Sequence, residues 1–145
     1  MATFGAVPAF QPPAIPWLTP QPLLEPLLLG PGLEDLPQLR HALQRLCADA
    51  TVQAVLAFGS RARGSAQADS DLDLAVIARE PSLNPALKTE RWLHYRALLG
   101  LLPVDLDLVV QGAADAEWLA GSRWHVMGDV ARDGMVLFVS AEREG

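Results

Sequence analysis

The stretch that decides the fold is residues 58–74, which read FGSRARGSAQADSDLDL. It continues an apolar run, VQAVLAF at residues 52–58, whose length and composition predict a buried β-strand. Gly59 and Ser60 end that run, and DLDLAVI at residues 71–77 predicts a second strand. A strand, a Gly-Ser turn that opens a short helix, and a second strand are therefore expected at the centre of the chain.

The Gly-Ser pair has the features of a phosphate site. Glycine allows a sharp turn and the close approach of a ligand, and the N–H groups at the start of a helix attract anions. Arg61 and Arg63 follow directly, and they are two of the 11 basic residues. The pattern predicts contacts with the phosphates of a nucleoside triphosphate, although a Gly-Ser pair alone is also common in ordinary loops.

Asp71 and Asp73 are two residues apart on a predicted strand, so their side chains are expected on one face, with Leu72 and Leu74 directed into the core. Two carboxylates directed at one point repel each other unless a cation lies between them, and carboxylate oxygens suit Mg²⁺. The alternative is the solvated polar face of an edge strand, which is the commoner origin of a D-x-D pattern taken alone.

A second acidic pair, Asp105 and Asp107, falls on VDLDLVV at residues 104–110, which predicts a third strand. A carboxylate on a neighbouring strand would complete a metal site. With Asp69, five of the 17 acidic residues lie on two short segments, and such clustering costs stability without a compensating cation.

The remaining sequence alternates between helices and strands. Leucines at positions 36, 39, 43 and 46 predict a helix with Asp35 as its N-cap and Pro37 in its first turn. Asn84 and Pro85 predict the start of another helix, which continues through Leu101 until Pro103 stops it. One further helix is expected between residues 113 and 131, followed by a strand at 135–139. This order indicates an α/β fold, a small mixed sheet flanked by helices.

Residues 1–32 differ in composition, because they contain eight of the 12 prolines and no lysine or arginine. Proline fixes φ and lacks an N–H donor, so we expect an extended arm here and place the folded domain at residues 33–145. The arm also carries apolar side chains. It is expected to lie along the surface of its own domain, with docking to another chain as the alternative.

Composition narrows the function classes. Half of the 145 residues are hydrophobic and 19% are charged, which suits one folded domain and excludes wholesale disorder. A formal net charge of -6 argues against general binding to nucleic acid. A single cysteine, the absence of an apolar run long enough to span a membrane, and a proline-interrupted N-terminus without basic residues lead us to expect a cytoplasmic protein.

Together these motifs resemble a known family. The string FGSRARGSAQADSDLDLAV resembles the G-S-x10-D-x-D signature of DNA polymerase β-like nucleotidyltransferases. It is most similar to the minimal members, which include adenylyltransferase antitoxins paired with HEPN-type toxins. PVDLDLVV and ARDGMVLF resemble the family's third-carboxylate strand and closing segment. The resemblance covers about residues 36–140 and implies the polymerase β-like nucleotidyltransferase fold.

The resemblance also implies residue roles. Asp71 and Asp73 would bind two Mg²⁺ ions, and a third carboxylate would bind the ion nearer the acceptor. We prefer Asp105 for this third position because it lies near the start of its strand, and keep Asp107 as the alternative. The residues expected to bind the nucleotide are Gly59, Ser60, Arg61 and Arg63.

The reaction implied is the transfer of AMP from ATP to a hydroxyl, with release of pyrophosphate. The expected acceptor is a protein, a HEPN-type toxin encoded by an adjacent gene, so the chain would act as an antitoxin. One alternative is an inactive module of the same fold that neutralises its partner by binding, and another is a small-molecule nucleotidyltransferase. Neither nucleic acid nor a membrane is expected as a partner.

Overall fold

The computed structural model describes residues 14–142, which fold around one four-stranded sheet of order β3-β2-β1-β4. The strands are β1 (Val52–Phe58), β2 (Leu72–Ala78), β3 (Leu106–Gly112) and β4 (Met135–Val139). β2 and β3 are parallel while the other pairs are antiparallel, so the sheet is mixed, as predicted. The strands predicted at 52–58 and 135–139 have the expected bounds, and those predicted at 71–77 and 104–110 begin slightly later.

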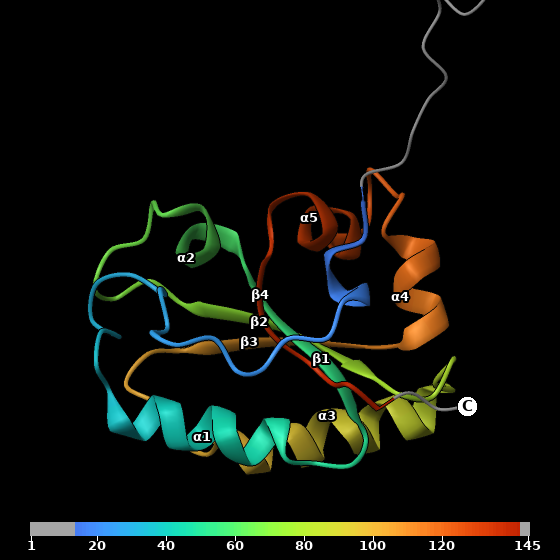
Figure 1. Cartoon of the computed structure of the whole chain (residues 1–145), viewed down its shortest axis with the longest axis horizontal. Coiled ribbons are helices and arrows are strands. Elements are labelled where there is room, and N and C mark those ends of the chain that lie inside the picture. The colour runs from blue at the N-terminus through green and yellow to red at the C-terminus, as the bar shows by residue number, and fades with distance from the viewer. Residues whose placement is uncertain (1–13, 143–145) are drawn as a thin grey trace, which may run out of the picture.

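Helices cover both faces of this sheet (Figure 1). They are α1 (Pro37–Cys47), α2 (Gly59–Arg63), α3 (Pro85–Leu99), α4 (Ala113–Leu119) and α5 (Val126–Asp133). α1 and α3 lie on one face, and α2, α4 and α5 lie on the other. Within residues 14–142, none of the helices combines the length and the apolar character that crossing a membrane requires.

The predicted ends of α1 and α3 agree only in part with the structure. The side chain of Asn84 accepts a hydrogen bond from the amide of Leu87 at 2.8 Å, so the predicted cap of α3 is confirmed. The predicted cap of α1 is wrong: α1 begins at Pro37, so Leu36 is its N-cap, and Asp35 adopts a φ of 49° one residue earlier. α3 ends at Leu99, before the predicted end, because Gly100 leaves the helical conformation with a φ of 67°.

The helix predicted between residues 113 and 131 is two helices. α4 ends at Leu119, and α5 has its own N-cap, His125, whose side chain accepts a hydrogen bond from the amide of Met127 at 3.0 Å. The intervening turn packs directly against α5, because a Cβ on Gly128 would lie 1.8 Å from the carbonyl oxygen of Ser122. A continuous helix would remove both contacts.

The sheet is apolar on both faces, and the alternation of side chains decides which face carries the acidic residues. Leu72 and Leu74 of β2 pack in the core beneath α1 and α3. Ala75 and Ile77 pack in the core beneath α4 and α5. Because successive side chains of a strand point to opposite faces, Asp73 lies on the α2, α4 and α5 side.

The described part of the proline-rich segment, residues 14–32, lies along its own domain. Gln21 forms an antiparallel bridge with Val139, and the amide of Leu24 donates to the carbonyl of Leu137 at 2.7 Å, so the segment covers the edge of β4. A short 3-10 helix (Pro16–Leu18), which was not expected, buries Trp17 to 2% exposure, and Leu29 is 1% exposed. Residues 1–13 of the predicted arm lie outside the described residues.

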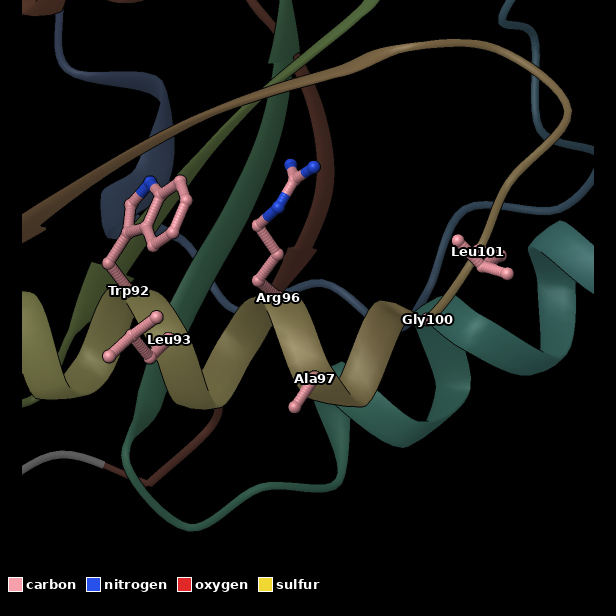
Figure 2. A pocket seen from close by; sticks show the side chains of 6 residues that line it. All are labelled: Trp92, Leu93, Arg96, Ala97, Gly100 and Leu101. Carbon is pink, nitrogen blue, oxygen red and sulfur yellow. The ribbon is translucent and has the colours of Figure 1, made fainter.

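The opposite edge of the sheet, β3, is covered by side chains from α3. The indole N–H of Trp92 donates to the carbonyl of Leu108 at 2.9 Å, and the guanidinium of Arg96 donates to the carbonyl of Leu106 at 3.0 Å. Arg96 also stacks over the Trp92 ring at 5.4 Å, and both side chains extend from α3 toward β3 (Figure 2). These contacts occupy carbonyls that would otherwise be free to pair with another strand.

Candidate active site

The Gly-Ser turn at the end of β1 packs against Asp73. Gly59 has a φ of 70°, a conformation that side chains disfavour, and a Cβ at this position would lie 2.1 Å from Oδ2 of Asp73. The antiparallel register of β1 and β2 explains this contact, because Phe58 is directly paired with Asp73. Glycine is therefore required here both by the turn and by the neighbouring carboxylate.

Asp73 has a second acidic neighbour across the sheet. In the parallel register of β2 and β3, Asp73 is paired with Asp107, so both side chains leave the same face from adjacent strands. Asp71 lies two residues before Asp73, just ahead of β2. Asp105 precedes β3, and its carbonyl accepts a hydrogen bond from the amide of Leu72 at 2.8 Å, which places it level with Asp71. The register thus favours Asp107, the alternative, over Asp105 as the carboxylate beside Asp73.

The electrostatics of Asp73 reflect this crowding. Burial raises the pKa of its carboxyl group, the negative charges of Asp107 and Asp71 raise the pKa further, and Arg63 acts in the opposite direction. Negative charges that raise the pKa of Asp73 in this way lie close enough to repel its ionised carboxylate. A bound cation would relieve that repulsion.

These carboxylates fit a magnesium site that is shared with a ligand. Mg²⁺ is commonly held by one or two carboxylates together with water and substrate phosphates. Among residues 14–142, no three His, Cys, Asp or Glu side chains converge closely enough to form a complete metal site. The carboxylate oxygens of Asp73 and Asp107 are of the type that Mg²⁺ prefers, and a metal held there would need further ligands from outside the protein.

The two arginines that follow the Gly-Ser pair lie in different environments. Arg63 is exposed at the end of α2, and its charge acts on Asp73. Arg61 is 1% exposed, and its guanidinium donates to backbone carbonyls in two other segments. The donors of Arg61 are thus occupied by backbone carbonyls in this structure, and its predicted contact with the nucleotide stays a prediction.

Ser60 and Asp69, two other residues singled out in the sequence, lie in α2 and in the loop that follows it. Ser60 is half-buried in the first turn of α2, and Asp69 is exposed in the turn at residues 67–70.

A separate surface groove of about 380 Å³ lies along α3, on the side of the sheet opposite Asp73. The residues lining the groove are Trp92, Leu93, Arg96, Ala97, Gly100 and Leu101 (Figure 2), and no carboxylate is among them.

The structure brings paired aspartates next to a Gly-Ser turn on a small mixed sheet, which are the features that resemble nucleotidyltransferases in the sequence. The sequence profile of the nucleotidyltransferase domain matches residues 39–125 of this chain. The chain therefore belongs to the nucleotidyltransferase domain family. This result confirms the resemblance inferred from the motifs.

Individual relatives and structures are also similar to parts of the chain. A probable protein adenylyltransferase, MntA, from Haemophilus influenzae is 50% identical over 48 residues, which are 33% of this chain and 40% of that protein. A crystal structure of a toxin–antitoxin pair with AMP-PNP is 22% identical, with a TM-score of 0.46 over 73% of this chain and 76% of that one. A nucleotidyltransferase-like structure from Sulfolobus solfataricus is 16% identical, with a TM-score of 0.43 over 74% and 88%.

Proposed function

We propose that this chain is a Mg²⁺-dependent nucleotidyltransferase that transfers AMP from ATP to a hydroxyl group. The observation that carries the proposal is the pairing of Asp73 with Asp107 beside the turn at Gly59, in a chain of the nucleotidyltransferase domain family. The choice of AMP is supported by the 48-residue similarity to a probable protein adenylyltransferase.

Asp73 and Asp107 would hold the metal, and Asp71 would add a third negative charge beside them. The bound Mg²⁺ would neutralise phosphate charge and keep the attacking and leaving oxygens in line. Arg63, exposed at the end of α2, offers a positive charge to the β- and γ-phosphates. The backbone at Gly59 and Ser60 would approach these phosphates closely, because Gly59 has no side chain to exclude them.

The transfer forms a bond between the acceptor hydroxyl oxygen and the α-phosphorus of ATP and breaks the bond between the α- and β-phosphates. Pyrophosphate leaves, and the hydroxyl proton must be accepted during attack. A carboxylate oxygen of Asp107 is suited to accept it, since Asp107 is exposed at the start of β3. The work of the chain is then mainly positioning and charge compensation.

The acceptor we propose is a protein, specifically a HEPN-type toxin encoded by an adjacent gene, with this chain acting as its antitoxin. Asp71, Asp105 and Asp107 are all exposed, so the site is open to a hydroxyl presented on another macromolecule. The toxin itself is implied by the motif resemblance.

Intact-mass spectrometry of the purified pair with ATP and Mg²⁺ tests this function. We expect the partner to gain the mass of one or more AMP units, and Asp73→Asn to abolish the gain while still binding the partner. A stable complex without any mass gain would instead support a binding module of the same fold. A mass gain that persists in Asp73→Asn would contradict the proposed site.

A further inference from the structure

Arg61 joins two segments that are far apart in the sequence. Its Nη1 donates to the carbonyls of Leu29 at 2.8 Å and Pro31 at 2.9 Å, within the proline-rich segment. Its Nε and Nη2 donate to carbonyls of the loop that precedes β2. These acceptors are Gln67 at 3.2 Å, Ala68 at 3.3 Å, and Ser70 at 2.9 Å from Nη2 and 3.1 Å from Nε.

This arrangement suits a guanidinium group and no other side chain. Arginine carries five N–H donors in a planar fork, whereas lysine carries three donors at a single atom. Here the donors meet five backbone carbonyls, and the side chain is 1% exposed. Such a buried charge is stable because each of its donors is satisfied by a carbonyl oxygen.

The same two segments also touch directly, independently of Arg61. A Cβ on Gly32, which has a φ of 86°, would lie 2.7 Å from the carbonyl oxygen of Ala68. A Cβ on Gly30, which has a φ of 88°, would lie 3.6 Å from the Cβ of Ala66 and 3.6 Å from Nη1 of Arg61, and both are ordinary contacts. The backbone at Gly32 thus lies too close to the loop to accept a side chain without a shift, whereas a methyl group at Gly30 would make only ordinary contacts.

The loop that is held in this way connects the two halves of the candidate site. It leaves α2 just after Arg63 and reaches Asp71 immediately before β2. Its turn at residues 67–70 is closed by a hydrogen bond from the amide of Ser70 to the carbonyl of Gln67 at 3.1 Å. A displacement of this turn would move Asp71 relative to the Gly-Ser turn.

We infer that Arg61 is a positioning residue, which locks the loop at residues 67–70 against residues 29–32 and thereby sets the place of Asp71 relative to the Gly-Ser turn. The inference rests on the function proposed above. It makes the last part of the proline-rich segment a support for the candidate site, through its contacts with Arg61 and Ala68.

The test compares Gly32→Ala with Gly30→Ala. Both variants impose a methyl group on backbone with nearly the same positive φ, so both carry similar local strain. Only the methyl group at position 32 clashes with the carbonyl oxygen of Ala68, so the loop and residue 32 must move apart. We expect Tm to fall in both variants, and further in Gly32→Ala, because that variant adds the clash with Ala68 to the shared strain. At a temperature where both are folded, Gly32→Ala should lower the rate at saturating ATP by roughly 10- to 100-fold, and Gly30→Ala should not.

A readout that does not depend on turnover accompanies the rates. Amide hydrogen exchange at Ser70 should be faster in Gly32→Ala than in Gly30→Ala, because the turn at residues 67–70 is the part displaced. Equal exchange and equal rates in the two variants would overturn the inference. If the wild-type chain transfers no nucleotide, the proposed function fails, while the exchange comparison still decides whether the lock exists.

Arg61→Lys and Arg63→Gln separate positioning from phosphate binding. A lysine at position 61 can satisfy some of the five carbonyls, so we expect a reduced kcat, faster exchange at Ser70 and little change in KM for ATP. Arg63→Gln should raise KM for ATP and leave the exchange at Ser70 unchanged. A rise in KM alone for Arg61→Lys would show that Arg61 binds phosphate, and the inference would be wrong.

Discussion

Asp73 of β2 and Asp107 of β3 stand side by side in the parallel register of the sheet, each directed to the face that also carries the Gly-Ser turn. Neighbouring strands are separated by about 4.8 Å, so the two carboxylates face one another at short range. The pKa of Asp73 is raised first by burial and then by the charge of Asp107, which marks a place where a cation would bind favourably.

Asp105 and Asp107, which lie just before and within β3, should respond differently to substitution. Asp107→Asn removes the carboxylate paired with Asp73, so we expect it to lower Mg²⁺-dependent transfer by roughly 10²-fold or more. Asp105→Asn, which lies before β3, should lower it far less. Rates measured across a range of Mg²⁺ concentrations check this, and an inactive Asp105→Asn beside an active Asp107→Asn would reverse the assignment.

A polar network outside the site should make stability depend on pH. Asp49 accepts hydrogen bonds from the Thr51 hydroxyl at 2.6 Å and from its amide at 3.0 Å, and contacts Nε2 of His94 at 2.6 Å. Burial alone would raise the pKa of Asp49, but the hydrogen bonds from Thr51 and His94 outweigh it and lower the pKa below the usual 3.8.

Because the folded state lowers this pKa, ionised Asp49 stabilises the fold above the unfolded value of 3.8, and that stabilisation is lost as the pH falls through the lower folded value. Asp49→Asn should therefore reduce Tm near neutral pH, and the difference from wild type should shrink on acidification below that value. Glu117→Gln, a change at an exposed acid on α4, is the control and should leave Tm unchanged. A difference for Asp49→Asn that is independent of pH would contradict this account.

Trp17 should contribute to stability as a core residue, although it belongs to the proline-rich segment. It is 2% exposed and packs with the core beneath α4 and α5. Trp17→Ala should lower the free energy of unfolding by about 3–5 kcal/mol, as for other buried tryptophans. Trp124→Ala is the control, because Trp124 is 94% exposed, and chemical denaturation distinguishes the two. Equal effects would mean that the segment is not part of the folded core.

The hydrogen bond from Trp92 to Leu108, at the edge of β3, should make a measurable contribution to the free energy of unfolding. Trp92→Phe keeps an aromatic ring but removes the N–H that donates to Leu108, which should cost about 1 kcal/mol of stability. Trp118→Phe, at a residue that is 82% exposed, should change stability by less than about 0.5 kcal/mol. If both variants unfold at the same denaturant concentration, the contact with Leu108 contributes nothing.

The sequence alone predicts an element's bounds where neighbouring residues set them. The apolar runs at 52–58 and 135–139 become β1 and β4 because each is bounded by a turn, and Asn84 caps α3 because its side chain reaches the amide of Leu87. The helix break near residue 120 is not predicted, although its contacts are local: Ser122 packs against Gly128, and His125 caps α5 by accepting a hydrogen bond from the amide of Met127.

The candidate site was predictable in its residue types but not in its register. Spacing within a strand placed Asp71 with Asp73 and Asp105 with Asp107, but it cannot say which residues lie level across two strands. That alignment follows from the pairing of β2 with β3. The partners of Arg61 could not be predicted for a related reason, because they are backbone carbonyls and no sequence pattern identifies them.

The most direct measurement of the central claim follows two labels of ATP in parallel reactions with Mg²⁺ and the partner protein. Label at the α-phosphate should become attached to protein, label at the γ-phosphate should be released in pyrophosphate, and Asp71→Asn with Asp73→Asn should abolish both. Attachment of the γ-phosphate label, or undiminished attachment of the α-phosphate label in the doubly substituted chain, would contradict a nucleotidyltransferase that works through these aspartates.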